Sequence, residues 1–143
     1  MLRHSTAADC RQIYQLICQQ ENTVIAYDDF QAIYNDQLTD RRYYAFVYEE
    51  NQTVAGFLSL RLEKQLHRAA AVAEITECIV APACRSRGLG HKLLKQAIIL
   101  AQIQGCCQLE VACRRQRPQL HVFHRNNSLK NTSCKFALEL TQN

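Results

Sequence analysis

The sequence predicts an α/β (α+β) fold in which helices flank one mixed, mostly antiparallel sheet. The chain has 143 residues, of which 48% are apolar, and this suits a domain with its own hydrophobic core. It holds only four Gly and two Pro, so its regular elements should be long. Apolar residues recur at strand spacing in some segments and at helix spacing in others. No linker or repeat interrupts them, so residues 1–143 are expected to form a single domain.

The predicted elements follow from local patterns taken in chain order. A strand at 2–5 precedes a helix that Ser5 or Thr6 caps, with Asp9 in its first turn. The other elements are a helix at 28–36, strands at 43–48, 53–62 and 70–80, a helix at 88–104, a strand at 107–113, a short helix at 118–125 and a last strand at 134–140, with a further short strand near Leu129 left open. The helix at 88–104 has the clearest apolar face. Together with the strands on either side it should form a parallel crossover.

Composition and charge argue against several classes of function. The N-terminus lacks the apolar run of a signal peptide, and no segment approaches the roughly eighteen apolar residues of a membrane span. We therefore expect a cytoplasmic protein with no membrane partner. The net charge is only +4, and the densest basic run, at 114–117, has no interleaved aromatic residues. No nucleic-acid partner is expected from this pattern.

The cysteine content is high, but its spacing points to no metal centre. The eight cysteines include no C-x-x-C pair, and the five histidines match no zinc-binding spacing. Most of the thiols are expected to be free and buried as small apolar groups. Cys84 is the exception to watch, because it lies beside the turn described next.

A basic, glycine-containing turn separates the strand at 70–80 from the following helix. Its sequence is Arg85-Ser86-Arg87-Gly88-Leu89-Gly90. Small residues let backbone N–H groups approach an anion, and the helix N-terminus adds a partial positive charge. The dinucleotide fingerprint fails because Leu93 occupies the position of its third glycine, and no Walker pattern is present. The turn therefore predicts an anion site of another kind.

The turn resembles the R-x-x-G-x-G/A signature of the GCN5-related N-acetyltransferases (GNAT). The Val80-Ala81-Pro82 that leads into it and the Leu93-Leu94 after it fit the same pattern, and the order of elements is similar over the whole chain. The resemblance implies an acetyl-CoA-dependent N-acetyltransferase that acts by direct attack of an amine on the thioester. The implied diphosphate contacts are Arg85, Ser86, Arg87, Gly88, Leu89, Gly90 and His91, and the implied pantetheine contacts are Cys78, Ile79 and Val80. The resemblance also implies that the protein could form a homodimer.

A narrower resemblance concerns the acceptor. Residues 14–18, 65–68 and 73–80 are similar to bacterial aminoalkylphosphonate N-acetyltransferases. This implies a small-molecule amine acceptor, with Tyr27, Asp28 and His67 bordering its site. A protein or peptide N-acetyltransferase and a non-catalytic acyl-CoA-binding module remain alternatives.

Glu74 and Glu77 are the candidates for the catalytic base. An alkylammonium with a pKa of about 10.4 is only about 0.1% neutral near pH 7.4, so a base assists attack. The two glutamates are three residues apart and should face opposite sides of a regular strand, unless a bulge intervenes. Glu74 is slightly favoured, acting directly or through water.

His124 is the candidate for the acid that protonates the leaving thiolate. Aligning Val122-Phe123 with the family's A-x-x-F-Y pattern places His124 where a Tyr is usual, and a Gly-Tyr typical of the aminoalkylphosphonate subgroup is replaced by Ser128-Leu129. A His with an ordinary pKa near 6.5 is only about 10% protonated at pH 7.5. His124 could thus be an acid with a lower pH optimum, or the acid is missing and activity is weak. His121 is the alternative if the register shifts by one turn.

Overall fold

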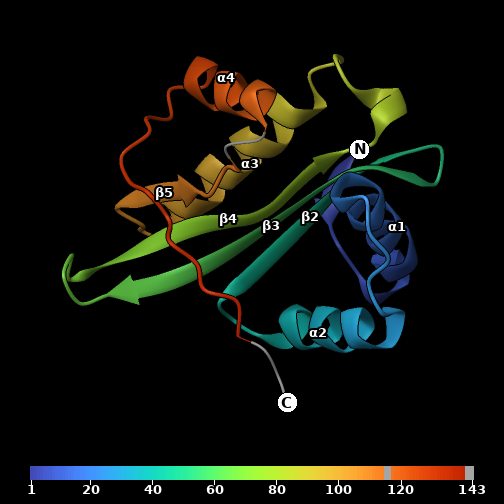
Figure 1. The fold of residues 1–143 in the computed structure, drawn as a ribbon, viewed down its shortest axis with the longest axis horizontal. Coiled ribbons are helices and arrows are strands. Elements are labelled where there is room, and N and C mark those ends of the chain that lie inside the picture. The colour runs from blue at the N-terminus through green and yellow to red at the C-terminus, as the bar shows by residue number, and fades with distance from the viewer. Residues whose placement is uncertain (115–116, 141–143) are drawn as a thin grey trace. The chain divides into compact units, whose positions relative to one another are not determined.

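The computed structural model describes residues 1–114 and 117–140 and divides into two compact units, residues 1–111 and 112–143. Figure 1 shows the fold. The first unit contains β1 (Leu2–His4), a 3₁₀ turn (Ala7–Asp9), α1 (Cys10–Glu21), α2 (Tyr27–Thr39), β2 (Tyr43–Glu50), β3 (Thr53–Gln65), β4 (Ala70–Val80), a second 3₁₀ turn (Pro82–Cys84), α3 (Leu89–Ile103) and β5 (Gln108–Val111). The second unit contains α4 (Pro118–Asn126).

The five strands form one sheet in the order β1-β2-β3-β4-β5. Every neighbouring pair is antiparallel except β4 and β5, which are parallel. Because α3 connects these two strands, the predicted crossover over 70–113 is confirmed. The predicted α/β fold with a mostly antiparallel sheet is confirmed with it.

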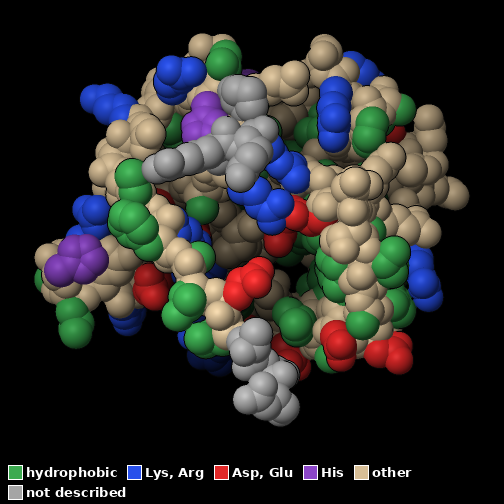
Figure 2. Space-filling view, viewed as in Figure 1, with side chains coloured by type: hydrophobic (Ala, Val, Ile, Leu, Met, Phe, Trp, Pro, Cys, Tyr) green, Lys and Arg blue, Asp and Glu red, His purple; other side chains and the backbone are tan. Residues whose placement is uncertain are grey.

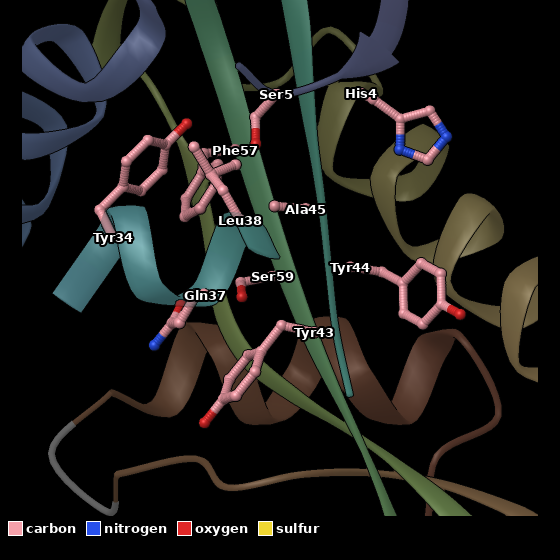
Figure 3. A pocket seen from close by; sticks show the side chains of 10 residues that line it. All are labelled: His4, Ser5, Tyr34, Gln37, Leu38, Tyr43, Tyr44, Ala45, Phe57 and Ser59. Atoms are coloured by element: carbon pink, nitrogen blue, oxygen red, sulfur yellow. The ribbon is translucent and has the colours of Figure 1, made fainter. Parts of the chain in front are cut away.

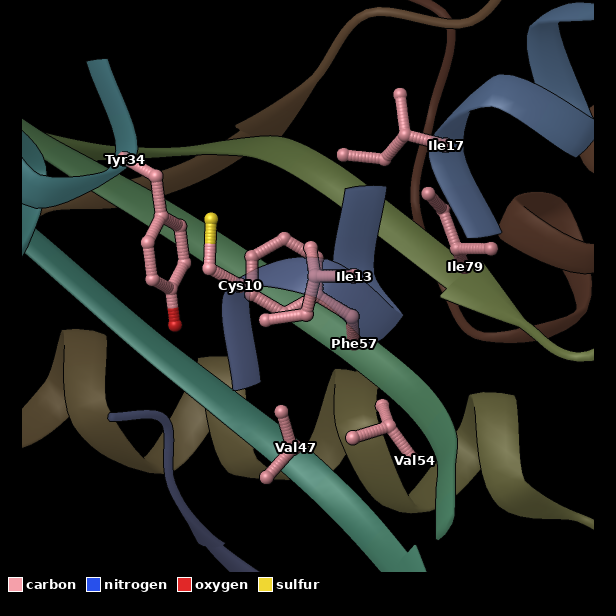
Figure 4. Close-up of a cluster of buried hydrophobic side chains, with 8 residues drawn as sticks. All are labelled: Cys10, Ile13, Ile17, Tyr34, Val47, Val54, Phe57 and Ile79. Atoms are coloured by element: carbon pink, nitrogen blue, oxygen red, sulfur yellow. The ribbon is translucent and has the colours of Figure 1, made fainter. Parts of the chain in front are cut away.

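Helices cover both faces of the sheet (Figure 1). On one face, which we call the α1/α2 face, side chains of α1 and α2 pack on the strands. Figure 4 shows this cluster, which consists of Cys10, Ile13, Ile17, Tyr34, Val47, Val54, Phe57 and Ile79. The opposite face, the α3 face, carries the fully buried Leu58 and Leu60 of β3. It receives the buried side of α3, including Leu93, whose Cδ1 lies 3.0 Å from the position that a Cβ on Gly56 would take.

The entry into α1 is stabilised by a buried carboxylate. The sequence predicts a cap at Ser5 or Thr6 with Asp9 in the first turn, and the structure has a capping box of Thr6 and Asp9, in which the Thr6 N–H donates to Asp9 Oδ2 at 2.8 Å. Arg3 donates to both Asp9 oxygens at 2.8 and 2.9 Å and, through Nε, to Glu49 on β2. The Arg3 guanidinium therefore holds the pKa of Asp9 below its usual range. This network connects β1, the start of α1 and β2.

The main structural surprise is a β-bulge in β4. Ser59 of β3 pairs with Glu77, whereas the next residue, Leu60, pairs with Ile75, so Thr76 is an extra residue with no partner of its own. Its hydroxyl donates to the Ser59 carbonyl at 3.2 Å. A bulge shifts the alternation of side chains by one residue. As a result, Glu74 and Glu77 both lie on the α1/α2 face. The sequence predicted opposite faces for them unless a bulge intervened, and the bulge at Thr76 is that exception.

Several predicted boundaries change because tertiary pairing decides where an element ends. The strand at 53–62 continues to Gln65 and the helix at 28–36 extends to Thr39, while β5 is shorter than 107–113. The predicted last strand at 134–140 is wrong: the segment has no strand structure, and none forms near Leu129. Its alternating Phe136, Leu138 and Leu140 are more than 80% exposed. An alternating pattern is only half of a strand, because a neighbouring backbone must supply the hydrogen bonds.

Candidate functional site

The turn between β4 and α3 has the backbone geometry of an anion-binding loop. Ser86 and Gly88 both adopt left-handed conformations, with φ of 64° and 81°. Nothing lies within 4 Å of a Cβ built on Gly88, so this position needs glycine for its backbone angle and not for space. Left-handed residues in a tight turn can direct neighbouring N–H groups toward one side, which favours contact with an anion. Arg85, Ser86, Arg87 and Gly88 are exposed, so the loop is open to a ligand.

The start of α3 adds further donors. Its first intrahelical bond is from the Lys92 N–H to the Gly88 carbonyl at 3.1 Å. The N–H groups of Leu89, Gly90 and His91 precede that bond, at the helix end where N–H groups are not used by the i to i−4 pattern. They lie at the positive end of a 15-residue helix. Amides at such a helix end bind phosphate oxygens.

The two arginines of the turn have different environments. Arg85 Nε donates to the Val80 carbonyl at 3.3 Å, which keeps the side chain beside the end of β4. Arg87 forms two hydrogen bonds to Glu50, at 2.8 and 3.0 Å, and this carboxylate raises the pKa of Arg87. Arg85 therefore remains the better candidate for a direct phosphate contact, whereas Arg87 joins the turn to β2.

The end of β4 has one open edge within residues 1–111. β3 pairs with β4 from Ala70 to Val80, but β5 pairs only with Val72–Ile75. The Ala81 N–H points toward β3, where it donates to the Ala55 carbonyl at 2.8 Å. Since successive residues of a strand direct their N–H and C=O groups to opposite edges, those of Cys78 and Val80 point to the open edge. An extended ligand could pair with them as an added strand.

The side chains at this end of β4 are structural. Ile79 packs in the α1/α2 core cluster. Cys78 faces the other side of the sheet, and burial raises the pKa of its thiol to about 11. Cys78 is therefore an inert thiol at neutral pH. Cys84, beside the turn, is free and partly exposed.

The two candidate bases stand in neighbouring rows of the α1/α2 face. Glu74 pairs across the sheet with Arg61, whose Nη2 donates to Glu74 Oε2 at 2.9 Å. Glu77 is directly opposite Ser59. The sequence did not reveal Arg61, because no local pattern predicts which cross-strand partner a bulged strand will meet.

A cavity of about 240 Å³ lies between α2 and the strands β2 and β3, next to Ser59. Figure 3 shows Tyr34, Gln37 and Leu38 of α2 on one side and Tyr43, Phe57 and Ser59 of the sheet on the other. The rings of His4 and Tyr44 point away from it in the same view. Ser59 is 2% exposed, and Tyr34 donates from its hydroxyl to the Thr6 carbonyl at 2.7 Å. The cavity is mostly apolar with a few hydroxyl groups, and its volume is below the roughly 300 Å³ at which typical ligand pockets begin, so it could take only a small molecule.

The three predicted acceptor contacts lie elsewhere in the first unit. Tyr27 packs on α1, with its ring 5.0 Å from that of Tyr14 and the Arg11 guanidinium 3.8 Å from its centroid. Asp28 is exposed in the first turn of α2. His67 is exposed in the β3–β4 turn, about 13 Å beyond the Glu74 row at strand spacing. None of the three lines the cavity, and their role in binding stays a prediction.

His124 belongs to the second unit, on α4. It is half-buried, and burial lowers its pKa, with the nearby His121 adding to the effect. Its Nδ1 is buried and has no hydrogen-bond partner among the described residues. His121 Nε2 lies 2.8 Å from the Arg114 carbonyl. At neutral pH His124 is therefore protonated less often than an ordinary histidine.

Other kinds of site find little support in the described part of the chain. No group of three or more His, Cys, Asp or Glu side chains there could hold a metal ion. Among the same residues, no helix is long and apolar enough to cross a membrane. Figure 2 shows basic and acidic side chains interspersed on one face of the molecule, with no block of a single sign.

Comparisons with known proteins agree with this fold. The model of the acetyltransferase (GNAT) family matches residues 8–127. The aminoalkylphosphonate N-acetyltransferase of Salmonella typhimurium is 29% identical over 139 residues, which are 97% of this chain and 90% of that protein. A transcriptional regulator from Bacillus halodurans C-125 has the same fold, with a TM-score of 0.91 and 18% identity over 98% of this chain and 99% of the other. An aminoglycoside N-acetyltransferase in complex with CoA gives a TM-score of 0.87 and 14% identity over 98% and 93%.

Proposed function

The chain belongs to the acetyltransferase (GNAT) family, and we propose that it acetylates the primary amine of a small molecule, with aminoalkylphosphonates as the first candidates. As a member of this family it is an N-acetyltransferase that uses acetyl-CoA. The observation that carries the proposal is the left-handed turn at Ser86 and Gly88, which opens α3 beside the open edge of β4. The narrower acceptor class is supported by the similarity to the Salmonella enzyme.

The residues present fit acetyl-CoA. The N–H groups of Leu89, Gly90 and His91 and the Arg85 side chain would hold its diphosphate, in accord with the open helix end. The backbone of Cys78 and Val80 would hold its pantetheine arm along the open edge of β4. When bound, acetyl-CoA supplies a thioester carbonyl as the electrophile.

The chain's own residues must then handle two protons. A glutamate, directly or through water, would take a proton from the acceptor ammonium, so that the free amine could form the N–C bond as the C–S bond breaks. The nitrogen loses a second proton as the amide forms, which balances the proton that the departing thiolate gains. Glu77 is our first choice, because it is paired across the sheet with Ser59, which lines the cavity. Glu74 is paired with Arg61, one row farther along the strands. The leaving thiolate takes a proton from an acid, and His124 remains the candidate. Because its pKa is lowered, we expect weak acid assistance above neutral pH.

The first test separates cofactor binding from turnover. Titration calorimetry with acetyl-CoA on the wild type, Arg85→Ala and Arg87→Ala should give micromolar binding to the wild type. We expect about a tenfold to hundredfold loss for Arg85→Ala, because a charge-assisted contact to phosphate is removed. Arg87→Ala should lose less, since its guanidinium contacts Glu50. Arg42→Ala, in an exposed pair with Asp40, is the control.

Thiol release with a panel of amines, including 2-aminoethylphosphonate, then ranks the acceptors. Binding of acetyl-CoA without release on any amine would favour an acyl-CoA-binding module over an enzyme. Release only with peptides would favour the protein or peptide alternative. No binding of acetyl-CoA would contradict the proposal as a whole. A homodimer and a cytoplasmic location stay predictions from the sequence.

A further inference from the structure

Arg61 has hydrogen-bonding capacity that its known contact does not use. Its Nη2 donates to Glu74 at 2.9 Å, but its Nε is buried and has no partner among the described residues. A guanidinium carries five N–H donors in a planar fork that matches carboxylate and phosphate oxygens. The side chain as a whole is 35% exposed, so a ligand can reach the outer part of its guanidinium from solvent, whereas Nε lies at the buried end of the fork.

The position of Arg61 links it to the cavity. It is paired across the sheet with Tyr43, and it follows Ser59 by two residues on the same strand, so all three side chains share the α1/α2 face. Tyr43 and Ser59 line the cavity. Arg61 does not itself line the cavity, but it lies one row beyond Ser59 and beside Tyr43 on the same face of the sheet.

Opposite charges lie on neighbouring strands of this face. Glu77 is opposite Ser59 and Arg61 is opposite Glu74, so Arg61 and Glu77 are diagonal neighbours across the Thr76 bulge. In a regular ladder, diagonal neighbours are roughly 7–8 Å apart, and their Cβ atoms are somewhat closer. A short molecule with an amine at one end and an anion at the other, separated by two or three carbons, matches such a pair of charges. A neutral amine would leave Arg61 unused.

Resting on the function proposed above, we propose that Arg61 recognises the anionic group of a short zwitterionic acceptor while the acceptor's amine faces Glu77. Glu74 holds the guanidinium in place from the neighbouring strand. The acceptor class is thus an ω-amino phosphonate or a related ω-amino anion. Arg61 determines specificity and takes no part in the proton transfers.

The test compares two primary amines of similar length. One carries an anionic group at the end away from the amine, and the other carries an uncharged methyl group there. The kcat/KM of the wild type, Arg61→Gln and Arg61→Lys is measured with 2-aminoethylphosphonate and with propylamine. Arg61→Gln should lose about 10- to 100-fold with the phosphonate, mainly through KM, because a charge-assisted contact disappears. Its activity with propylamine should stay within about threefold, and Arg61→Lys should recover part of the loss because it restores the charge but not the fork.

Arg42→Gln is the matched control, because it also replaces one arginine by glutamine. Arg42 directly precedes β2 and contacts Asp40. Arg42→Gln should leave kcat/KM unchanged with both amines. Thermal melts of all variants check that each is folded. Equal losses with both amines in Arg61→Gln would overturn the proposal, since Arg61 would then serve only to hold Glu74. A wild type that acetylates propylamine as well as the phosphonate would overturn it too, while leaving the proposed N-acetyltransferase function intact. A wild type that binds acetyl-CoA but acetylates neither would contradict the proposed acceptor class itself.

Discussion

Glu74 and Glu77 carry the same functional group, but their surroundings make them different candidates for the base. Glu74 accepts a hydrogen bond from Arg61, while Glu77 stands opposite the cavity residue Ser59. The sequence alone slightly favoured Glu74, because nothing in it revealed the bulge or the arginine. With both carboxylates on the same face, the choice depends on their contacts and no longer on alternation.

We expect Glu77→Gln to lower kcat/KM by about 10²- to 10⁴-fold at pH 7.5, the usual contribution of a general base. The loss should shrink as the pH rises toward the pKa of the acceptor amine, because free amine becomes abundant without help. The measurement is a pH–rate profile with propylamine, which does not depend on Arg61. Glu74→Gln serves as the comparison and should lose less. A larger loss in Glu74→Gln would assign the base to Glu74.

At the scale of elements, α3 depends on a close approach to β3. The Cβ of an alanine at position 56 would lie 3.0 Å from Leu93 Cδ1 and 3.3 Å from the Ile79 carbonyl oxygen. Leu93 is fully buried, so it has little room to move aside. Gly56 is therefore required for space between the helix and the sheet.

Gly56→Ala should lower the free energy of unfolding by about 1–3 kcal/mol, the typical cost of overpacking. Urea denaturation measures this change. In a double-mutant cycle with Leu93→Ala, part of the cost should disappear, because the atom that clashes has been removed. Strict additivity of the two changes would show that Leu93 is not the source of the strain.

The elements also show what the sequence could and could not predict. The bounds of β4 were predicted correctly, and α3 was predicted to within one residue at each end, because apolar spacing, Pro82 and the glycines mark those boundaries. The position of the turn between β4 and α3 followed from the same residues, while its binding of an anion stays a prediction. The bulge at Thr76 was not predictable, since no glycine or proline marks it. The cavity and Arg61 depend on strand register, which is a property of pairs of segments and not of one segment.

At the scale of the whole molecule, the network of Arg3, Asp9 and Glu49 links distant parts of the first unit. Asp9 is 4% exposed and its pKa is lowered, chiefly by the hydrogen bonds from Arg3. A carboxyl whose pKa is lower in the folded state stabilises the fold fully at pH values above its ordinary pKa of 3.8. This contribution is lost as the pH falls through the lowered value of the folded state.

Asp9→Asn should therefore reduce the free energy of unfolding at pH 7 by about 2–3 kcal/mol, because a charged, mostly buried partner of Arg3 is lost. Below pH 3.8 the difference from the wild type should narrow, because the unfolded wild type then binds a proton at Asp9 that the folded state, with its lowered pKa, binds only at lower pH. Urea unfolding at pH 7 and at pH 3 measures both values. The control is Asp40→Asn, whose partner Arg42 is 69% exposed, and it should cost far less. A constant difference across this pH range would contradict the assigned role of the Asp9 charge.

The extra residue at Thr76 also affects how this chain can be compared with its relatives. Before Thr76 the even-numbered Glu74 faces the cavity side of β4, and after it the odd-numbered Glu77 and Ile79 do. In a relative without the extra residue, side chains at every second position face the same side along the whole strand. An ungapped alignment to such a relative would place one of the two glutamates on the wrong side of the sheet. Comparisons of catalytic residues in this strand should therefore allow a single-residue gap at Thr76, so that side chains are matched by the face they occupy.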